Sequence, residues 1–203
     1  MREERADGRT MTRDAIDIEL ACADDVADMV ALANRAAETG TANFATEPEP
    51  VASWQREWAN TRELYPWLVA RAGGRVAGFA KIAPHRSRGA YRWTAEMSVY
   101  VDEAWHGRGI GSALYRILIP LARAQGYVTL LAGITAGHTA SERLHQRAGF
   151  VRCGTYHRAG WKFGAWHDVG YWELHLSPPD RAPDPIRRVD EMWTARAIAR
   201  PPP

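Results

Sequence analysis

The chain has 203 residues, of which 46% are hydrophobic, so it is long enough to bury a sizeable core within one domain. Its 26 basic residues nearly balance its 24 acidic residues, which gives no reason to expect nucleic acid or an anionic membrane as a partner. Two cysteines are too few for a disulfide framework and fit a reducing compartment. These properties favour a cytoplasmic globular protein.

The two ends of the chain differ in composition from its middle. Residues 1–15 are polar, and this charged start lacks the apolar stretch of a secretory signal. No apolar run reaches the roughly 18 residues that a membrane helix needs. Residues 178–203 are rich in proline, which supplies no backbone donor and should not extend a sheet, although residues 189–199 have helical spacing. We therefore expect an N-terminal tail over 1–15, one domain over 16–177 and a proline-rich tail over 178–203.

The hydrophobic periodicity of the domain predicts strands and helices in mixed order. Alternating apolar residues and turn signals, such as Gly73-Gly74 between two apolar runs, indicate strands at 16–22, 67–71, 76–83, 92–101, 128–134, 150–156 and 168–176. Apolar residues three and four apart indicate helices at 26–37, 54–61, 112–124 and 139–148. The resulting order is β-α-α-β-β-β-α-β-α-β-β, which predicts an α+β domain around a mixed, mostly antiparallel sheet.

A glycine-rich loop, His106-Gly-Arg-Gly-Ile-Gly-Ser112, lies between a predicted strand and a predicted helix. Glycine lets the backbone approach a ligand closely, and free N–H groups at a helix start form an anion site together with the helix dipole. A pyrophosphate suits this arrangement, although glycine also occurs in plain strand-to-helix turns. A P-loop would need a lysine after the last glycine, where Ser112-Ala113 stands. A dinucleotide fingerprint would need a third glycine at Ser112 and an acidic residue near position 130, and both are missing.

The same loop resembles the acetyl-CoA loop of the GNAT superfamily, Gln/Arg-x-x-Gly-x-Gly/Ala. Gly109 and Gly111 match it, while His106 stands at the first position. The stretch His138-Thr-Ala-Ser-Glu-Arg-Leu-His145-Gln-Arg-Ala-Gly-Phe150 resembles the second signature, Asn-x-x-Ala-x-x-Leu-Tyr-x-x-x-Gly-Phe. His138 takes the asparagine position and His145 the tyrosine position, and histidine at the latter is typical of the phosphinothricin acetyltransferase branch.

Four further segments resemble the phosphinothricin and methionine sulfoximine acetyltransferases, namely residues 41–48, 65–70, 93–101 and 164–170. The resemblance covers residues 16 to 176. It implies the GNAT fold, an acetyl-CoA-dependent N-acetyltransferase, acetyl-CoA as co-substrate and a homodimer with pockets near the interface. It also implies a small amino-acid substrate whose α-amine is acetylated in a ternary complex, such as phosphinothricin, methionine sulfoximine or methionine sulfone.

Acetyl transfer to an amine requires removal of a proton, because an aliphatic amine is mostly ammonium at neutral pH. In the alternating strand 92–101, Glu96 shares a face with Thr94, Ser98 and Tyr100. The resemblance implies that this face opens onto the amine site and that Glu96 is the base, directly or through water. Otherwise Glu96 is a solvated carboxylate. His145 is the second catalytic candidate, either as a proton donor to departing CoA or as a wall of the pocket.

The resemblance also implies which residues bind acetyl-CoA. Backbone N–H groups of the strand around Ser98 would polarise the thioester carbonyl, and those of the glycine loop would bind the pyrophosphate. Arg108 would add charge to the loop or would be a solvated cation. The expected cofactor-binding residues are Ser98, Val99, Tyr100, Val101, His106, Gly107, Arg108, Gly109, Ile110, Gly111, Ser112, His138 and Ser141.

Substrate recognition is predicted at Arg86 and Arg88, which resemble a basic pair that holds an acidic amino acid, because two guanidiniums can grip a carboxylate and a second oxyanion. Phe44 and Tyr91 could line the same pocket or belong to the core, and His85 leaves its shape open. Seven histidines show no H-E-x-x-H or zinc spacing, so no metal is expected.

Two alternatives remain at this point. One is an acetyltransferase for another amine, such as a polyamine, an aminoglycoside or a protein N-terminus. The other is a CoA-binding protein without catalysis, to which His106 and His138 give some support.

Overall fold

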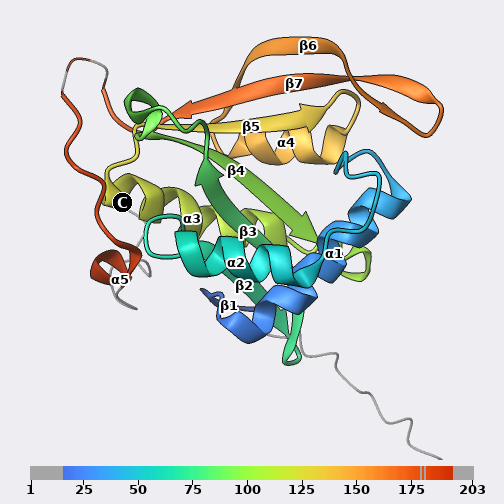
Figure 1. The fold of residues 1–203 in the computed structure, drawn as a ribbon, viewed down its shortest axis with the longest axis horizontal. Coiled ribbons are helices and arrows are strands. Elements are labelled where there is room, and N and C mark those ends of the chain that lie inside the picture. The colour runs from blue at the N-terminus through green and yellow to red at the C-terminus, as the bar shows by residue number, and fades with distance from the viewer. Residues whose placement is uncertain (1–15, 179, 181, 194–203) are drawn as a thin grey trace, which may run out of the picture.

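A computed structural model describes residues 16–178, 180 and 182–193. Seven strands form one sheet in the order β1-β2-β3-β4-β5-β7-β6, and only the β4–β5 pair is parallel (Figure 1). The strands are β1 (Ile16–Leu20), β2 (Trp67–Ala72), β3 (Arg75–Pro84), β4 (Thr94–Val101), β5 (Thr129–Thr135), β6 (Val151–Lys162) and β7 (Ala165–His175). The helices are α1 (Val26–Thr39), α2 (Val51–Thr61), α3 (Ile110–Gln125), α4 (Thr139–Arg147) and α5 (Val189–Met192). The predicted α+β class and element order are confirmed.

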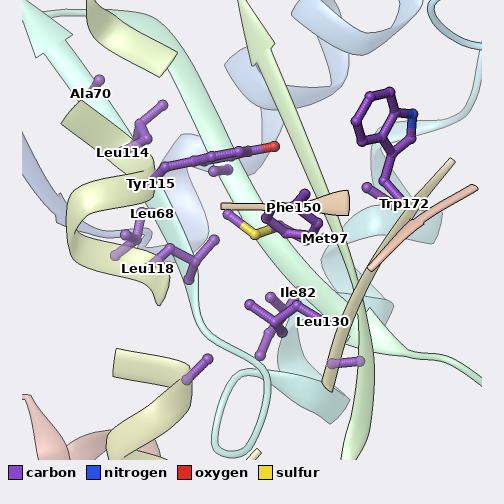
Figure 2. Packing of buried hydrophobic residues seen from close by; sticks show 14 of the residues in the cluster. Leu68, Ala70, Ile82, Met97, Leu114, Tyr115, Leu118, Leu130, Phe150 and Trp172 are labelled. Atoms are coloured by element: carbon purple, nitrogen blue, oxygen red, sulfur yellow. The ribbon is translucent and has the colours of Figure 1, made fainter. Parts of the chain in front are cut away.

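The sheet carries a hydrophobic core on each face. In β2, alternate residues point to opposite faces, so Trp67 and Val69 pack with α1 and α2, while Leu68 and Ala70 pack with α3. Figure 2 shows the α3 side, where Tyr115 and its helical neighbours lie against the sheet strands. Both faces of β2 and β3 are buried because helices cover each side of the sheet, and this explains their nearly continuous apolar sequences.

The β6–β7 hairpin is longer than the sequence predicted. The two strands were expected at 150–156 and 168–176, whereas β6 extends to Lys162 and β7 begins at Ala165. Irregularities in pairing between Arg152 and Gly154 and between Tyr156 and Gly160 interrupt the two-residue alternation. The periodic signal is therefore lost in a segment that is nevertheless paired.

The described part of the proline-rich segment packs on the domain. The backbone N–H of Arg187 donates to Gln125 at the end of α3 (2.8 Å), and that of Val189 donates to Glu63 after α2 (2.8 Å). Helix α5 covers only the first residues of the predicted 189–199 helix, and residues 194–199 lie outside the described part of the chain. Residues 182–193 thus cover the end of the domain where α2 and α3 finish.

Candidate active site

The site begins where β4 and β5 diverge. The two strands pair in parallel only from Thr94 to Glu96 of β4, while β3 pairs with β4 as far as Val101. On the other side, β7 pairs with β5 as far as Thr135. The second half of β4 and the second half of β5 therefore have no strand partner toward each other, which opens the sheet at its centre and exposes backbone polar groups along β4.

A groove of about 580 Å³ occupies this opening. It is bounded by the second half of β4, the glycine loop, the first turn of α3, the end of β5 and α4. Twelve of the thirteen residues predicted to bind acetyl-CoA line it: Ser98, Val99, Tyr100, Val101, His106, Gly107, Gly109, Ile110, Gly111, Ser112, His138 and Ser141. Arg108 is not among the lining residues, because its guanidinium lies over the Trp105 ring at 4.7 Å.

The glycine loop adopts the conformation that an anion cradle needs. Gly107 and Gly109 have φ values of 74° and 84°, which residues with a β-carbon rarely adopt. Helix α3 begins directly after Gly109, so the first N–H groups of the helix lie at the mouth of the groove without partners inside the helix. The His106 Nε2 donates to the Val101 carbonyl (2.9 Å) and thereby ties the loop to the end of β4. The open strand edge and this cradle fit the pantetheine arm and the pyrophosphate of CoA.

Two cations that were not predicted from the sequence lie on the groove. Arg143 and Arg147 lie one turn apart on the exposed side of α4, and both line the groove. Their four-residue spacing on a helix next to the glycine loop was the available signal. The other unpredicted lining residues are mostly small or apolar and form its walls: Ala42, Met97, Trp105, Gly133, Ile134, Thr135, Ala140 and Leu144.

His145 lines the groove but is buried, with 3% of its surface exposed. Its Nδ1 donates to the Ser141 carbonyl (2.8 Å), and its Nε2 accepts the Tyr115 hydroxyl proton (2.8 Å). This assignment makes the ring neutral, and burial also lowers its pKa. Tyr115 was missed because its position on α3 reads as an ordinary core residue. In this arrangement both ring nitrogens are already hydrogen-bonded.

His138 caps α4. Its Nδ1 accepts the backbone N–H of Ser141 at 3.4 Å, at the place where an N-cap side chain normally satisfies the helix start. The imidazole therefore caps the helix, as a shorter polar side chain usually does, and it also borders the groove.

Glu96 lies on β4 immediately before the residues that line the groove. Its Oε1 is 2.7 Å from the Nδ1 of His85, a residue that follows β3. The antiparallel register pairs Ala83 with Glu96, which brings His85 back over the carboxylate. The Arg86 Nε donates to the His85 Nε2 at 3.3 Å. The pairing of His85 with Glu96 was not predicted, because it depends on the β3–β4 register.

The predicted substrate residues fall into two groups. Arg86 and Tyr91 join His85, since the guanidinium lies 5.7 Å from the Tyr91 ring centre and the His85 ring meets Tyr91 edge-on. Arg88 is exposed in the same loop, two residues after Arg86. Phe44 lies elsewhere, packed against His167 and so close to Gly160 that a β-carbon there would be 2.6 Å from its ring. Phe44 thus anchors the loop after α1 to the β6–β7 hairpin.

Within residues 16–178, 180 and 182–193, no group of three or more His, Cys, Asp or Glu side chains is placed to hold a metal ion. No helix in these same residues is both long and apolar enough to cross a bilayer.

Comparison with known proteins shows the family of the chain. Residues 28–150 match the acetyltransferase (GNAT) family. A phosphinothricin N-acetyltransferase from Streptomyces viridochromogenes is 39% identical, covering 89% of this chain and 98% of its own. An L-methionine sulfoximine/L-methionine sulfone acetyltransferase from Pseudomonas aeruginosa is 39% identical, covering 78% and 94%.

A crystal structure shows the same relationship. A GNAT superfamily phosphinothricin acetyltransferase from Sinorhizobium meliloti in complex with acetyl-CoA superposes with a TM-score of 0.79 at 29% identity, covering 83% of this chain and 93% of that one. The divergent strands, the glycine cradle and these matches together show that the chain belongs to the acetyltransferase (GNAT) family and is an acetyl-CoA-dependent N-acetyltransferase.

Proposed function

We propose that the enzyme acetylates the α-amine of a small amino acid with an acidic or sulfonyl side chain, such as phosphinothricin, methionine sulfoximine or methionine sulfone. The observation that carries this proposal is the cluster of Glu96, His85 and Arg86 beside the groove where β4 and β5 diverge. The two curated relatives are named for these substrates and support the same class.

Binding of the acetyl donor is assigned to backbone groups. The open edge of β4 after Glu96 pairs with the pantetheine arm, and N–H groups there polarise the thioester carbonyl. The N–H groups at the start of α3 bind the pyrophosphate. Arg143 and Arg147 add positive charge beside it.

The acceptor amine is assigned to the Glu96 side of the opening. Arg86 and Arg88 hold the substrate carboxylate and its second oxyanion, because a guanidinium forms paired charge-assisted bonds with both. Glu96 supplies the carboxylate of the base that removes a proton from the ammonium. The amine then attacks the acetyl carbon in a ternary complex. Both cysteines are free and exposed, and neither lines the groove, which supports direct transfer without an acyl-enzyme.

His145 is assigned to the pocket wall. Its two nitrogens are occupied by Ser141 and Tyr115, so protonating the leaving thiolate would require breaking a buried hydrogen bond. The thiolate of CoA is a stable leaving group near neutral pH and does not require a dedicated acid.

A homodimer is proposed through β6 and its turn into β7. Strand β6 is an edge of the sheet, and large apolar side chains on the hairpin are more than half exposed: Val151, Tyr156, Trp161, Phe163 and Trp166. An unpaired edge with exposed aromatic residues favours association, and a two-fold contact would cover the same surface on both copies. Trp161→Arg with Trp166→Arg should shift the mass measured by light scattering from two chains to one.

The proposed location is the cytoplasm, which the exposed free cysteines support.

The decisive experiment measures CoA thiol release from acetyl-CoA with a panel of amines. L-phosphinothricin, L-methionine sulfone, glutamate, spermidine and kanamycin are compared, with Glu96→Ala in parallel. We expect release with the acidic and sulfonyl amino acids and a loss of about 10²- to 10⁴-fold in kcat for the variant. Release with spermidine or kanamycin alone would refute the substrate class. Acetyl-CoA binding without release for any amine would favour a catalytically silent protein.

A further inference from the structure

We propose that the proton acceptor is a histidine–carboxylate pair in which His85 Nε2 takes the proton and Glu96 holds the imidazole. This inference rests on the proposed acetylation of an amine beside Glu96. His85 directly follows β3 and Glu96 lies in the adjacent strand β4, and the separation of 2.7 Å between Nδ1 and Oε1 is that of a charge-assisted hydrogen bond. The pair is therefore part of the sheet framework that also shapes the groove.

The hydrogen bonds around the ring define its tautomer. The Arg86 Nε carries a hydrogen and is placed to donate to His85 Nε2, so Nε2 bears the lone pair. Nδ1 then carries the hydrogen that is donated to Glu96. Tyr91 packs edge-on against the ring at 5.5 Å and holds its plane. A carboxylate on one nitrogen and a lone pair on the other is the arrangement that makes an imidazole a general base.

Exposure also distinguishes the two partners. The Glu96 side chain is 52% exposed, whereas the His85 side chain is 16% exposed. The imidazole is held in a fixed orientation by Glu96 and Tyr91, whereas the carboxylate is largely solvated. His85 therefore supplies the oriented proton acceptor, and Glu96 stabilises the imidazolium that forms.

The transfer needs no further reactant. The hydrogen bond from Arg86 Nε to His85 Nε2 breaks when the guanidinium binds the substrate carboxylate, which frees the Nε2 lone pair. The N–H bond of the substrate ammonium then breaks, its electron pair stays on the nitrogen for attack on the acetyl carbon, and the proton bonds to His85 Nε2. Water accepts the proton after product leaves. The charged and titratable groups that face the pair are Arg86 and Tyr91 from the loop after β3 and Tyr171 from β7. The phenol of Tyr171 is close enough to interact electrostatically with both Glu96 and Arg86.

Arg86 links the base to substrate recognition. Its Nε–H occupies the Nε2 lone pair in the free enzyme. A substrate carboxylate bound to Arg86 draws this N–H away and leaves the lone pair free for the ammonium proton. Proton transfer therefore depends on the bound carboxylate, and an α-carboxamide substrate should lose kcat as well as binding.

The test compares His85→Gln with wild type, using the best amine of the panel. Glutamine can still donate to Glu96 but cannot accept a proton, so a residue that only positions Glu96 would be rescued by it. We expect kcat to fall about 10²- to 10³-fold, KM for both substrates to change less than about 3-fold, and the acid limb of the kcat/KM profile to be lost. His157→Gln is the matched control, because His157 forms an equivalent pair with Asp168 (2.8 Å) on the β6–β7 hairpin, and its profile should equal that of wild type.

Nitrogen-15 NMR of the imidazoles provides an independent readout. We expect His85 to show a protonated Nδ1 and an unprotonated Nε2, and this signature to change in Glu96→Ala. A His85→Gln enzyme with kcat within about 3-fold of wild type and an unchanged pH profile would overturn the inference and leave Glu96 as the base. Absence of turnover by wild type for every amine would instead reject the proposed function.

Discussion

Replacement of Lys162 by methionine tests how the hairpin holds the wall of the groove. Lys162 is only 8% exposed at the end of β6, and its Nζ donates to the carbonyls of Ala37, Gly40 (3.2 Å) and Asn43 (2.7 Å). Ala37 lies in the last turn of α1, where carbonyls have no partner within the helix and the dipole favours a cation. The substitution keeps the apolar stem and removes three hydrogen bonds.

The magnitude follows from these contacts. A hydrogen bond to a charged group contributes about 1.5–3 kcal/mol, and the cost of burying the ammonium is recovered in the variant, so the net loss in unfolding free energy should be about 2–4 kcal/mol. For a chain of this size, each kcal/mol lowers Tm by about 2–4 °C, which gives a decrease of roughly 4–16 °C. Because Ala42 of this loop lines the groove, KM for acetyl-CoA should also rise.

Thermal and urea unfolding measure the loss, and Arg158→Met is the control. Arg158 is an exposed cation on the same strand, so its replacement should change stability by less than about 0.5 kcal/mol. A loss below about 1 kcal/mol for Lys162→Met would refute the reasoning, because the three carbonyls would then be satisfied equally well without the ammonium.

Three further predictions concern the groove and its walls. Arg143→Ala with Arg147→Ala should raise KM for acetyl-CoA about 3- to 10-fold at low salt with little change in kcat. The control Arg116→Ala on α3 should leave this KM unchanged. An increase in KM that does not depend on salt would contradict the electrostatic role. Burial lowers the pKa of His145, so below about pH 6.5 the unfolded chain binds a proton that the folded chain does not, and stability falls as the pH drops further. In His145→Gln, the slope of unfolding free energy against pH should decrease in this range by up to about 1.4 kcal/mol per pH unit. An unchanged slope would exclude His145 as its source. Gly78→Val should lower the unfolding free energy by about 1–3 kcal/mol and weaken acetyl-CoA binding, because the new β-carbon would lie 2.8 Å from the Tyr100 carbonyl oxygen. Thermal melts followed by circular dichroism measure the first effect, and binding calorimetry measures the second. Wild-type values in both would show that β4 can shift to accommodate the side chain.

The sequence alone predicted the secondary-structure elements and most of the residues that line the groove. Helices α1 and α3 carry apolar stripes with clear stop signals, and a local motif such as the loop at Gly107–Gly109 folds largely according to its own glycines. Twelve of the thirteen predicted acetyl-CoA residues therefore lie around one groove, because they belong to two short contiguous signatures and one strand.

The tertiary structure decided which side chains meet. The register between β3 and β4 brings His85 onto Glu96, and the packing of α3 on α4 brings the Tyr115 hydroxyl onto His145, which occupies its second nitrogen. Phe44 is placed against Gly160 by contacts between segments more than a hundred residues apart. Periodicity reports which face of an element is buried, but pairing across strands and helices depends on register and on long-range packing, and these give no local signal in the sequence.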